Sequence, residues 1–102
     1  MSGDRSRIEA IKAAHDIVAV AARRTHLVRR GREFVGLSPF KAEKTPSFTV
    51  DPSKQQFFCF STNQGGDVIA LVAALDGCDA AEAMRLLEAD MPGGAADPAR
   101  AA

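Results

Sequence analysis

The sequence contains no tryptophan and no tyrosine, so six phenylalanines are its whole aromatic complement. Its two cysteines, Cys59 and Cys78, are too few for a disulfide framework, and we expect both to be free thiols of a reducing compartment. No apolar run approaches the length that spans a bilayer, and the first ten residues, MSGDRSRIEA, lack the apolar region of a secretory signal. These absences exclude a disulfide-stapled or membrane-spanning protein and favour a cytoplasmic one.

The chain carries no net charge, but its charges are unevenly placed. Residues 1–60 hold eleven Lys and Arg against six Asp and Glu, a balance of +5, whereas residues 61–102 hold two against seven, a balance of −5. A basic half favours an anionic partner. Attraction between the two halves within one fold explains the same asymmetry, and the sequence leaves both interpretations open.

The 102 residues suffice for one domain, which begins with short helices and a sheet. Apolar spacing predicts helices over 8–14 and, capped by Asp16, to about residue 22. Residues 27–37, interrupted by a glycine turn, have the pattern of a hairpin. Residues 48–50 and 56–60 alternate apolar and polar side chains around an Asp-Pro-Ser-Lys turn, as paired strands do.

Two further helices are predicted after Gly65-Gly66, which permit a tight turn. Asp67 can cap the first helix and Gly77 ends it, and Asp79 starts the second. The order predicts an α+β fold, with an antiparallel sheet of about four strands flanked by short N-terminal helices and two C-terminal helices. We expect a domain over 1–91 and a flexible tail or linker over 92–102. The predicted buried positions of the two later helices are Val68, Leu71, Val72, Leu75, Ala83, Leu86 and Leu87.

The stretch GLSPFKAEKTPSFTVDPSKQQFFCFSTNQGGDVIALV resembles the N-terminal zinc-binding domain of bacterial, DnaG-type DNA primases. The motifs EKTPSF, from Glu43 to Phe48, and GGD, from Gly65 to Asp67, make the resemblance specific, and it extends over about residues 8–90. It implies a zinc-ribbon-like sheet and a module that binds single-stranded DNA template beside a primase polymerase domain. It implies no catalysis, and the chain shows no acidic cluster of the kind that phosphoryl transfer needs.

The chain differs from this family at the positions of the zinc ligands. The resemblance places zinc ligands, three Cys and one His, at Ser38, Lys41, Cys59 and Thr62. Hydroxyl groups and a lysine cation are poor zinc ligands, and a closed structural site needs four good ones. We therefore expect no zinc and no other cofactor.

The loss of zinc needs compensation, because a structural zinc contributes on the order of 10 kcal/mol to a small domain. We expect phenylalanine rings packed around the old site, each contributing about 1.5–3 kcal/mol. Ser38 and Thr62 can hydrogen-bond across the vacated position, and the amine of Lys41 can reach water or Glu43. The phenylalanines concerned are Phe34, Phe40, Phe48, Phe57, Phe58 and Phe60.

Basic residues of the first half form a candidate DNA-binding set, together with one aromatic ring. A solvated charged face is the alternative for each of them taken singly. Lys44 is the expected phosphate contact of its loop, while Thr45 and Ser47 are expected to satisfy local backbone groups. The predicted DNA-binding residues are Arg29, Arg30, Arg32, Lys41, Lys44, Lys54 and Phe58, with Arg23 and Arg24 beside them.

Strand alternation places Phe58 and Phe60 on one face and Phe57 and Cys59 on the other. One ring can stack on a base, but we expect at least two of these three phenylalanines to be buried. Cys59 and Cys78 are expected to be small buried residues without special reactivity, since neither has a cationic neighbour in sequence.

Two functions follow from these patterns. The first is a non-catalytic, zinc-free module that binds single-stranded DNA in replication. The second is a protein-interaction module, in which the same face or the helix over residues 68–75 docks a replication enzyme or a second copy of the chain. The sequence leaves open whether the chain acts alone or precedes a polymerase domain, and it does not fix an oligomeric state.

Overall fold

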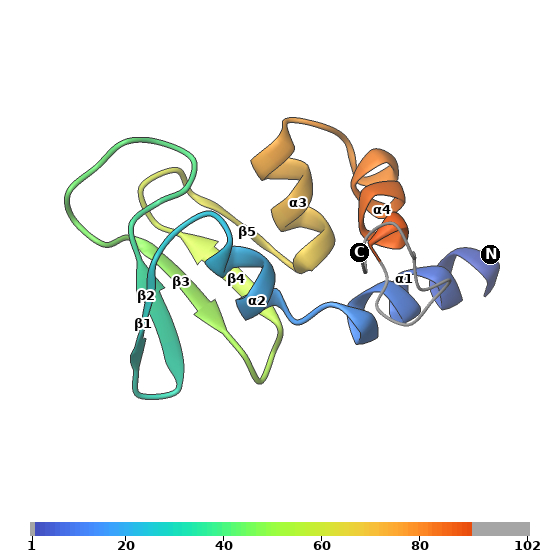
Figure 1. Cartoon of the computed structure of the whole chain (residues 1–102), viewed down its shortest axis with the longest axis horizontal. Coiled ribbons are helices and arrows are strands. Elements are labelled where there is room, and N and C mark those ends of the chain that lie inside the picture. The colour runs from blue at the N-terminus through green and yellow to red at the C-terminus, as the bar shows by residue number, and fades with distance from the viewer. Residues whose placement is uncertain (1, 91–102) are drawn as a thin grey trace, which may run out of the picture.

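The computed structural model describes residues 2–90, with side chains described from Arg5 onward. It is an α+β fold in which a five-stranded sheet forms one end of the molecule, α1 and α4 form the other, and α2 and α3 lie between (Figure 1). In chain order the elements are α1 (Ser2–Ala14), α2 (Ile17–Ala22), β1 (Leu27–Arg30), β2 (Glu33–Gly36), β3 (Phe48–Asp51), β4 (Gln56–Cys59), β5 (Gln64–Gly66), α3 (Val68–Asp76) and α4 (Ala80–Ala89). The predicted fold class is confirmed, and the predicted tail over 92–102 lies outside the described residues.

The sheet is a meander in the order β1-β2-β3-β4-β5, and every neighbouring pair is antiparallel. Because each strand returns beside the last, the β1–β2 and β3–β4 turns lie at one end of the sheet. The β2–β3 loop and the β4–β5 turn lie at the other end. Gly31 makes the first turn with φ of 63°, a backbone conformation that glycine adopts at little cost.

The fifth strand is absent from the sequence prediction, which assigned Gly65-Gly66 to a turn. In the structure Gly65 pairs with Phe58, and Gly66 pairs with Phe57. A Cβ on Gly65 would lie only 2.7 Å from the Phe58 ring. Glycine is therefore required in this strand by the close approach of a neighbouring side chain, a reason that local sequence cannot reveal.

The core lies between the inner face of the sheet and the helices. Phe48, Val50, Phe57 and Cys59 alternate onto this face and are all buried, as strand periodicity predicts. The rings of Phe40, Phe48 and Phe57 pack together with centroids 5.7–6.0 Å apart. The expected ring cluster thus exists, and it consists of three of the six candidate phenylalanines.

The helix boundaries follow their predicted caps. The carboxylates of Asp16, Asp67 and Asp79 each accept a backbone hydrogen bond at a helix N-terminus, and Gly77 ends α3 with φ of 65°. Three predictions fail. Leu75, predicted to be buried, is only half-buried. α1 begins at Ser2 and not near residue 8, and Leu86 is 40% exposed while Met84 is buried in its place. Among the described residues no helix is long and apolar enough to cross a membrane.

Candidate nucleic-acid interface

Two turns at one end of the sheet meet around Cys59. The β2–β3 loop brings Ser38 to this point, and the β4–β5 turn brings Ser61. Cys59 Sγ is fully buried, 3.3 Å from Ser38 Oγ and 3.3 Å from Ser61 Oγ. The two turns are thus held together by a thiol and hydroxyl groups at the position where the resemblance places a metal.

Glu43 joins this cluster from within the β2–β3 loop. Its carboxylate accepts a hydrogen bond of 2.8 Å from the backbone N–H of Ser38 and another from the hydroxyl of Ser47. Ser47 Oγ lies 2.9 Å from Ser61 Oγ, which links the loop to the β4–β5 turn. These bonds from Ser47 and Ser38 lower the pKa of Glu43 below its ordinary value.

The hydrogen bond expected between Ser38 and Thr62 is not formed. Ser38 contacts Cys59, and its oxygen also accepts the backbone N–H of Phe40 at 3.0 Å. The buried Oγ1 of Thr62 has no partner with hydrogen-bond geometry among the described residues. Lys41 is exposed and forms no ion pair in the part of the chain that the structure describes, although its charge helps to lower the pKa of Glu43.

Cys59 is buried, as expected, but its surroundings are polar. Burial by itself would raise the pKa of the thiol. Hydrogen bonds with the hydroxyl groups of Ser38 and Ser61 favour the thiolate more strongly, and the pKa falls to about 6. The expectation that Cys59 has no special reactivity considered only cationic neighbours and did not include these hydroxyl groups, of which Ser61 is a near neighbour and Ser38 comes from the β2–β3 loop. Cys78 is only half-buried, and burial raises the pKa of its thiol.

This set of side chains does not fit a closed zinc site. It offers one thiol, two hydroxyl groups and an exposed lysine, whereas structural zinc takes four Cys or His ligands in a tetrahedron. Within residues 5–90, no three side chains of His, Cys, Asp or Glu lie close enough together to hold a metal ion.

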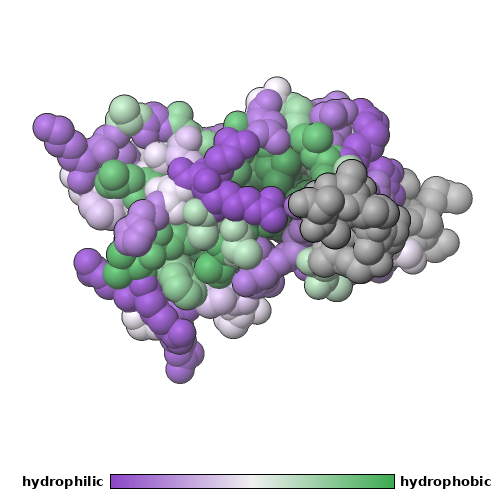
Figure 2. Space-filling view, in the orientation of Figure 1, coloured by the Kyte–Doolittle hydropathy of each residue, from purple (hydrophilic) through white to green (hydrophobic). Residues whose placement is uncertain are grey.

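The predicted basic residues fall into two groups at opposite ends of the sheet. Arg29, Arg30 and Arg32 belong to the β1–β2 hairpin, and Lys54 belongs to the β3–β4 turn at the same end. Lys41 and Lys44 lie in the β2–β3 loop at the other end. Strands of four residues separate the groups by about 13 Å. The single stripe that the sequence indicated is therefore divided, and hydrophilic side chains project around hydrophobic surface at the sheet end of the molecule (Figure 2).

The predicted DNA-binding residues of the sheet differ from the other basic residues in their ion pairing. Four of the five ion pairs among the described residues join a base of residues 7–24 to an acid of residues 67–90. Arg23 pairs with Asp90 at 3.3 Å, and Arg24 pairs with Asp76 at 2.6 Å. By contrast, Arg29, Arg30, Arg32, Lys41, Lys44 and Lys54 form no ion pair within the described chain. Attraction between the halves accounts for part of the charge asymmetry and leaves these six cations without an ion pair, although Arg29 donates to the carbonyl of Gly31 and lies over the Phe34 ring.

The outer face of the sheet, turned away from the helices, carries Phe58 and Phe60. Their rings pack edge to face with centroids 4.8 Å apart. Phe60 is 67% exposed, Phe58 is half-buried, and only Phe57 of the three is buried, so the expectation of two buried rings was wrong. The candidate residue that sequence reasoning missed is Phe60. The signal in the sequence was strand alternation, which places Phe60 on the same face as Phe58.

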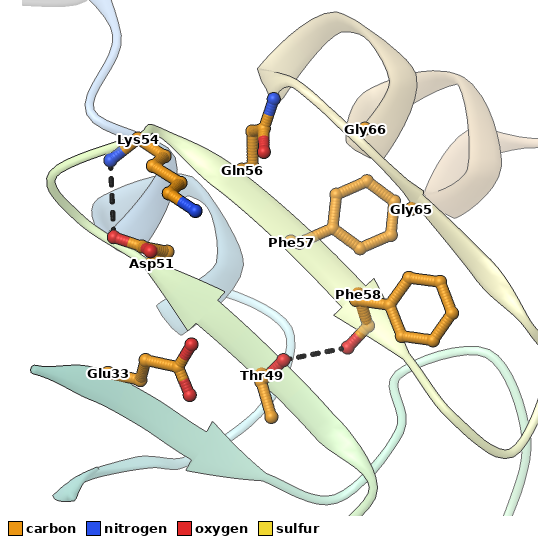
Figure 3. Close-up of a pocket in the computed structure, with 9 residues that line it drawn as sticks. All are labelled: Glu33, Thr49, Asp51, Lys54, Gln56, Phe57, Phe58, Gly65 and Gly66. Atoms are coloured by element: carbon orange, nitrogen blue, oxygen red, sulfur yellow. Dashed lines mark hydrogen bonds between the residues drawn. The ribbon is translucent and has the colours of Figure 1, made fainter.

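The outer face is not uniformly basic. Glu33 of β2 and Asp51 of β3 also lie on it, beside Lys54 of the turn (Figure 3). Neither carboxylate forms an ion pair in the described part of the molecule. The face therefore combines aromatic rings, cations at both ends and two carboxylates that form no ion pair in the described chain.

The CHC2 zinc-finger family matches residues 4–95 of the chain. The DNA primase of Geobacillus stearothermophilus is 44% identical over 82 residues, which make up 80% of this chain and 14% of that protein. The DNA primase of Synechococcus elongatus is 46% identical over 68 residues, 67% of this chain and 10% of the primase. The crystal structure of the zinc binding and RNA polymerase domains of Aquifex aeolicus primase is similar with a TM-score of 0.76 and 34% identity, over 83% of this chain and 21% of that one. The chain thus spans a small part of the length of these relatives.

Proposed function

The chain belongs to the CHC2 zinc-finger family of DNA primases, and from this premise we propose that it is a non-catalytic module that binds single-stranded template DNA during primer synthesis in the cytoplasm. The observation that carries the proposal is the selective pairing of charges. The six basic residues nominated for DNA have no ion-pair partner in the described chain, whereas Arg23 and Arg24, which follow α2, are paired. Unpaired cations around a face with exposed rings are suited to a phosphate backbone and its bases.

The arrangement suggests a path for the strand. A single strand crossing the outer face from the β1–β2 hairpin toward the β2–β3 loop meets cations at both ends and the rings of Phe58 and Phe60 between them. A polymerase domain, such as the one named for the Aquifex relative, is the proposed partner that uses the template held in this way.

We test the proposal by fluorescence anisotropy with a labelled single strand of about 15 nucleotides in a salt series. Contacts from four of the six cations give a slope of about −2.8 in log affinity against log salt, so a fourfold rise in salt weakens binding about 50-fold. The variant Arg30→Ala/Arg32→Ala/Lys44→Ala should lose most of the affinity and flatten the slope. Arg85→Ala, which removes a cation of α4, is the matched control. Absence of binding at low salt contradicts the proposal.

We also propose that the module functions without zinc. The support is chemical: a single thiol and two hydroxyl groups stand where the family has four strong ligands. Elemental analysis of the sample used for DNA binding should find far less than one zinc per chain, and a chelator should leave the melting temperature unchanged. One tightly held zinc per chain would refute this proposal and leave the DNA-binding proposal standing.

A protein-interaction module is the second candidate. Val28 and Leu37 are 48% and 41% exposed beside an apolar hollow of about 250 Å³ on the β1–β2 hairpin. The helix expected to dock a partner is a poor candidate, because Val68, Leu71 and Val72 of α3 are buried inside the molecule. Light scattering distinguishes this candidate: a defined oligomer that Val28→Ser/Leu37→Ser disrupts, together with weak DNA binding, favours it over the first.

A further inference from the structure

A hollow of about 470 Å³ opens on the outer face of the sheet, on the side of the β3–β4 turn. Figure 3 shows its walls: β2 and β3 supply carboxylates, the turn supplies an amine, and β4 and β5 supply a ring beside a glycine. The residues used below are Glu33, Asp51, Lys54, Gln56, Phe58 and Gly65.

One wall of the hollow is aromatic. The ring of Phe58 lies against β5 at Gly65, its direct partner across the strands. The missing side chain of Gly65 makes room for the ring, since a Cβ would lie 2.7 Å from it. Phe60 packs edge-on against the same ring. A half-buried ring held by a glycine and a second ring is a rigid surface on which a planar group can stack.

Another wall carries hydrogen-bond acceptors. Asp51 Oδ1 accepts the backbone N–H groups of Ser53 and Lys54, at 3.0 and 3.1 Å, and this holds its side chain in place. No hydrogen bond among the described residues uses Asp51 Oδ2. Glu33 stands on the neighbouring strand, because Phe34 pairs with Val50 and the next residues along the two strands are Glu33 and Asp51. The hydroxyl of Thr49 is already donated to the carbonyl of Phe58, at 3.2 Å, so it adds no free donor for these carboxylates.

The aromatic wall and the carboxylate wall together indicate which class of ligand the hollow can bind. Free carboxylates repel phosphate, so they do not serve the backbone of a nucleic acid. They accept hydrogen bonds from amino groups, as Asp and Glu do from the exocyclic amine of cytosine. Unstacked bases of single strands are recognised by stacking on a ring and by hydrogen bonds along their edges.

We propose that this hollow holds one base of the bound strand on Phe58, and that Glu33 and Asp51 select bases with an exocyclic amino group over thymine and uracil. The inference rests on the proposed binding of single-stranded DNA and adds its base preference. Lys54 and Arg30 contact the flanking phosphates. Gln56, exposed at the rim, supplies a further amide for the base edge.

Oligonucleotides of deoxycytidine and deoxyuridine, about 15 nucleotides long, test the preference. Both are flexible pyrimidine strands of equal charge, and the bases differ in an amino group against a carbonyl. The wild-type protein should bind oligo-dC about five- to tenfold more tightly than oligo-dU at the same salt concentration. Oligo-dT should bind like oligo-dU, which excludes an effect of the methyl group.

The variants Glu33→Gln and Asp51→Asn, singly and together, test the two carboxylates. Asp51→Asn keeps the oxygen that caps the turn and places an NH₂ donor at the free position. The dC-to-dU ratio should fall to about one or below, while binding of oligo-dU is kept or strengthened because negative charge is removed. Glu9→Gln, an exposed carboxylate on α1, is the matched control, and melting curves verify folding of each variant.

The outcomes separate the two proposals. Absence of binding to every oligonucleotide overturns both. Equal binding of oligo-dC and oligo-dU by the wild-type protein overturns the inference and leaves the DNA-binding proposal intact. A preference for oligo-dC that survives in the double variant also overturns it, because the selection then lies elsewhere.

Discussion

Glu43 is a charged loop residue whose carboxylate serves as a hydrogen-bond acceptor inside its own loop. The sequence places it in a loop beside two lysines, where a solvated charge is the ordinary expectation. The structure shows its carboxylate accepting hydrogen bonds from Ser38 and Ser47, which ties both ends of the β2–β3 loop together. The hydroxyl of Ser47 contacts the side chains of Glu43 and Ser61, and not the backbone groups that were predicted as its partners.

The first prediction concerns Glu43→Gln. The hydrogen bonds from Ser47 and Ser38 hold the pKa of Glu43 below its ordinary value of 4.5. A carboxyl group whose pKa is lower in the folded state contributes stability above its unfolded pKa and loses it as the pH falls through the folded pKa. Glu43→Gln should therefore melt at a lower temperature than the wild type near pH 7, and the difference should shrink below pH 4.5. Circular dichroism melts across this range measure it.

Glu9→Gln is the control for this experiment, because Glu9 is exposed on α1. It should leave the melting temperature unchanged at every pH. If Glu43→Gln lowered the melting temperature equally at neutral and acid pH, the stabilisation would not come from the ionised carboxylate.

The second prediction separates stability from binding at Phe60. The ring is 67% exposed, so Phe60→Ala should change the free energy of unfolding by less than about 1 kcal/mol. Loss of a stacked base should weaken single-stranded DNA binding by about 1–3 kcal/mol, or about five- to 150-fold. Anisotropy and urea titrations measure the two effects. Leu86→Ala, an exposed apolar residue on α4, should leave DNA affinity unchanged, and a loss there would point to an indirect effect.

The helices and strands differ in how far local sequence predicts them. The caps Asp16, Asp67 and Asp79 were read from sequence, because a cap depends on a side chain and backbone groups two or three residues away. β5 was not, because it exists through pairing with β4. α2 shows both cases: its cap Asp16 is local, but Gln55, 38 residues away, also accepts the backbone N–H of Ile17 at 2.8 Å.

The third prediction therefore concerns Gln55→Ala. It removes the acceptor of Ile17 N and the donor to Asp16, so it leaves a partly buried N–H unpaired at the start of α2. The free energy of unfolding should fall by about 1–3 kcal/mol. Gln56→Ala, the adjacent exposed residue, should cost less than about 0.5 kcal/mol. Equal losses in urea denaturation would mean that the bond from the β3–β4 turn does not stabilise α2.

The whole molecule joins a basic half to an acidic half and still leaves cations without an ion pair at both ends of the sheet. Arg7–Glu88, Arg23–Asp90 and Arg24–Asp76 hold the N-terminal helices against α3 and α4. The β2–β3 loop and the β4–β5 turn lie close together at the position where the family binds zinc. Ser38 Oγ and Cys59 Sγ lie 3.3 Å apart, close to the separation of about 3.8 Å between two thiolates on a tetrahedral zinc.

The fourth prediction follows from this retained spacing. The variant Ser38→Cys/Lys41→His/Thr62→Cys, with the native Cys59, should bind one zinc per chain and melt at a higher temperature with zinc than without it. The wild-type protein is the control and should show neither effect. A triple variant that folds but binds no zinc would mean that the turns have moved apart since the ligands were lost.

The sequence alone determined what depends on neighbours along the chain: helix caps, strand alternation, the turn residues and the family motifs from Glu43 to Asp67. The sequence also showed that three of the family's four zinc ligands are replaced, because this depends only on which residues stand at those positions. Only the tertiary structure decided which arginines are used in ion pairs, that the cations divide between two ends of the sheet, and that Phe60 is exposed. It also decided that Cys59 lies among hydroxyl groups and that Gly65-Gly66 form a strand. These features depend on three-dimensional contacts. Some join residues far apart in sequence, as in the ion pairs, and some join near neighbours that a turn brings together, as in Cys59 and Ser61, and periodicity carries no information about either kind.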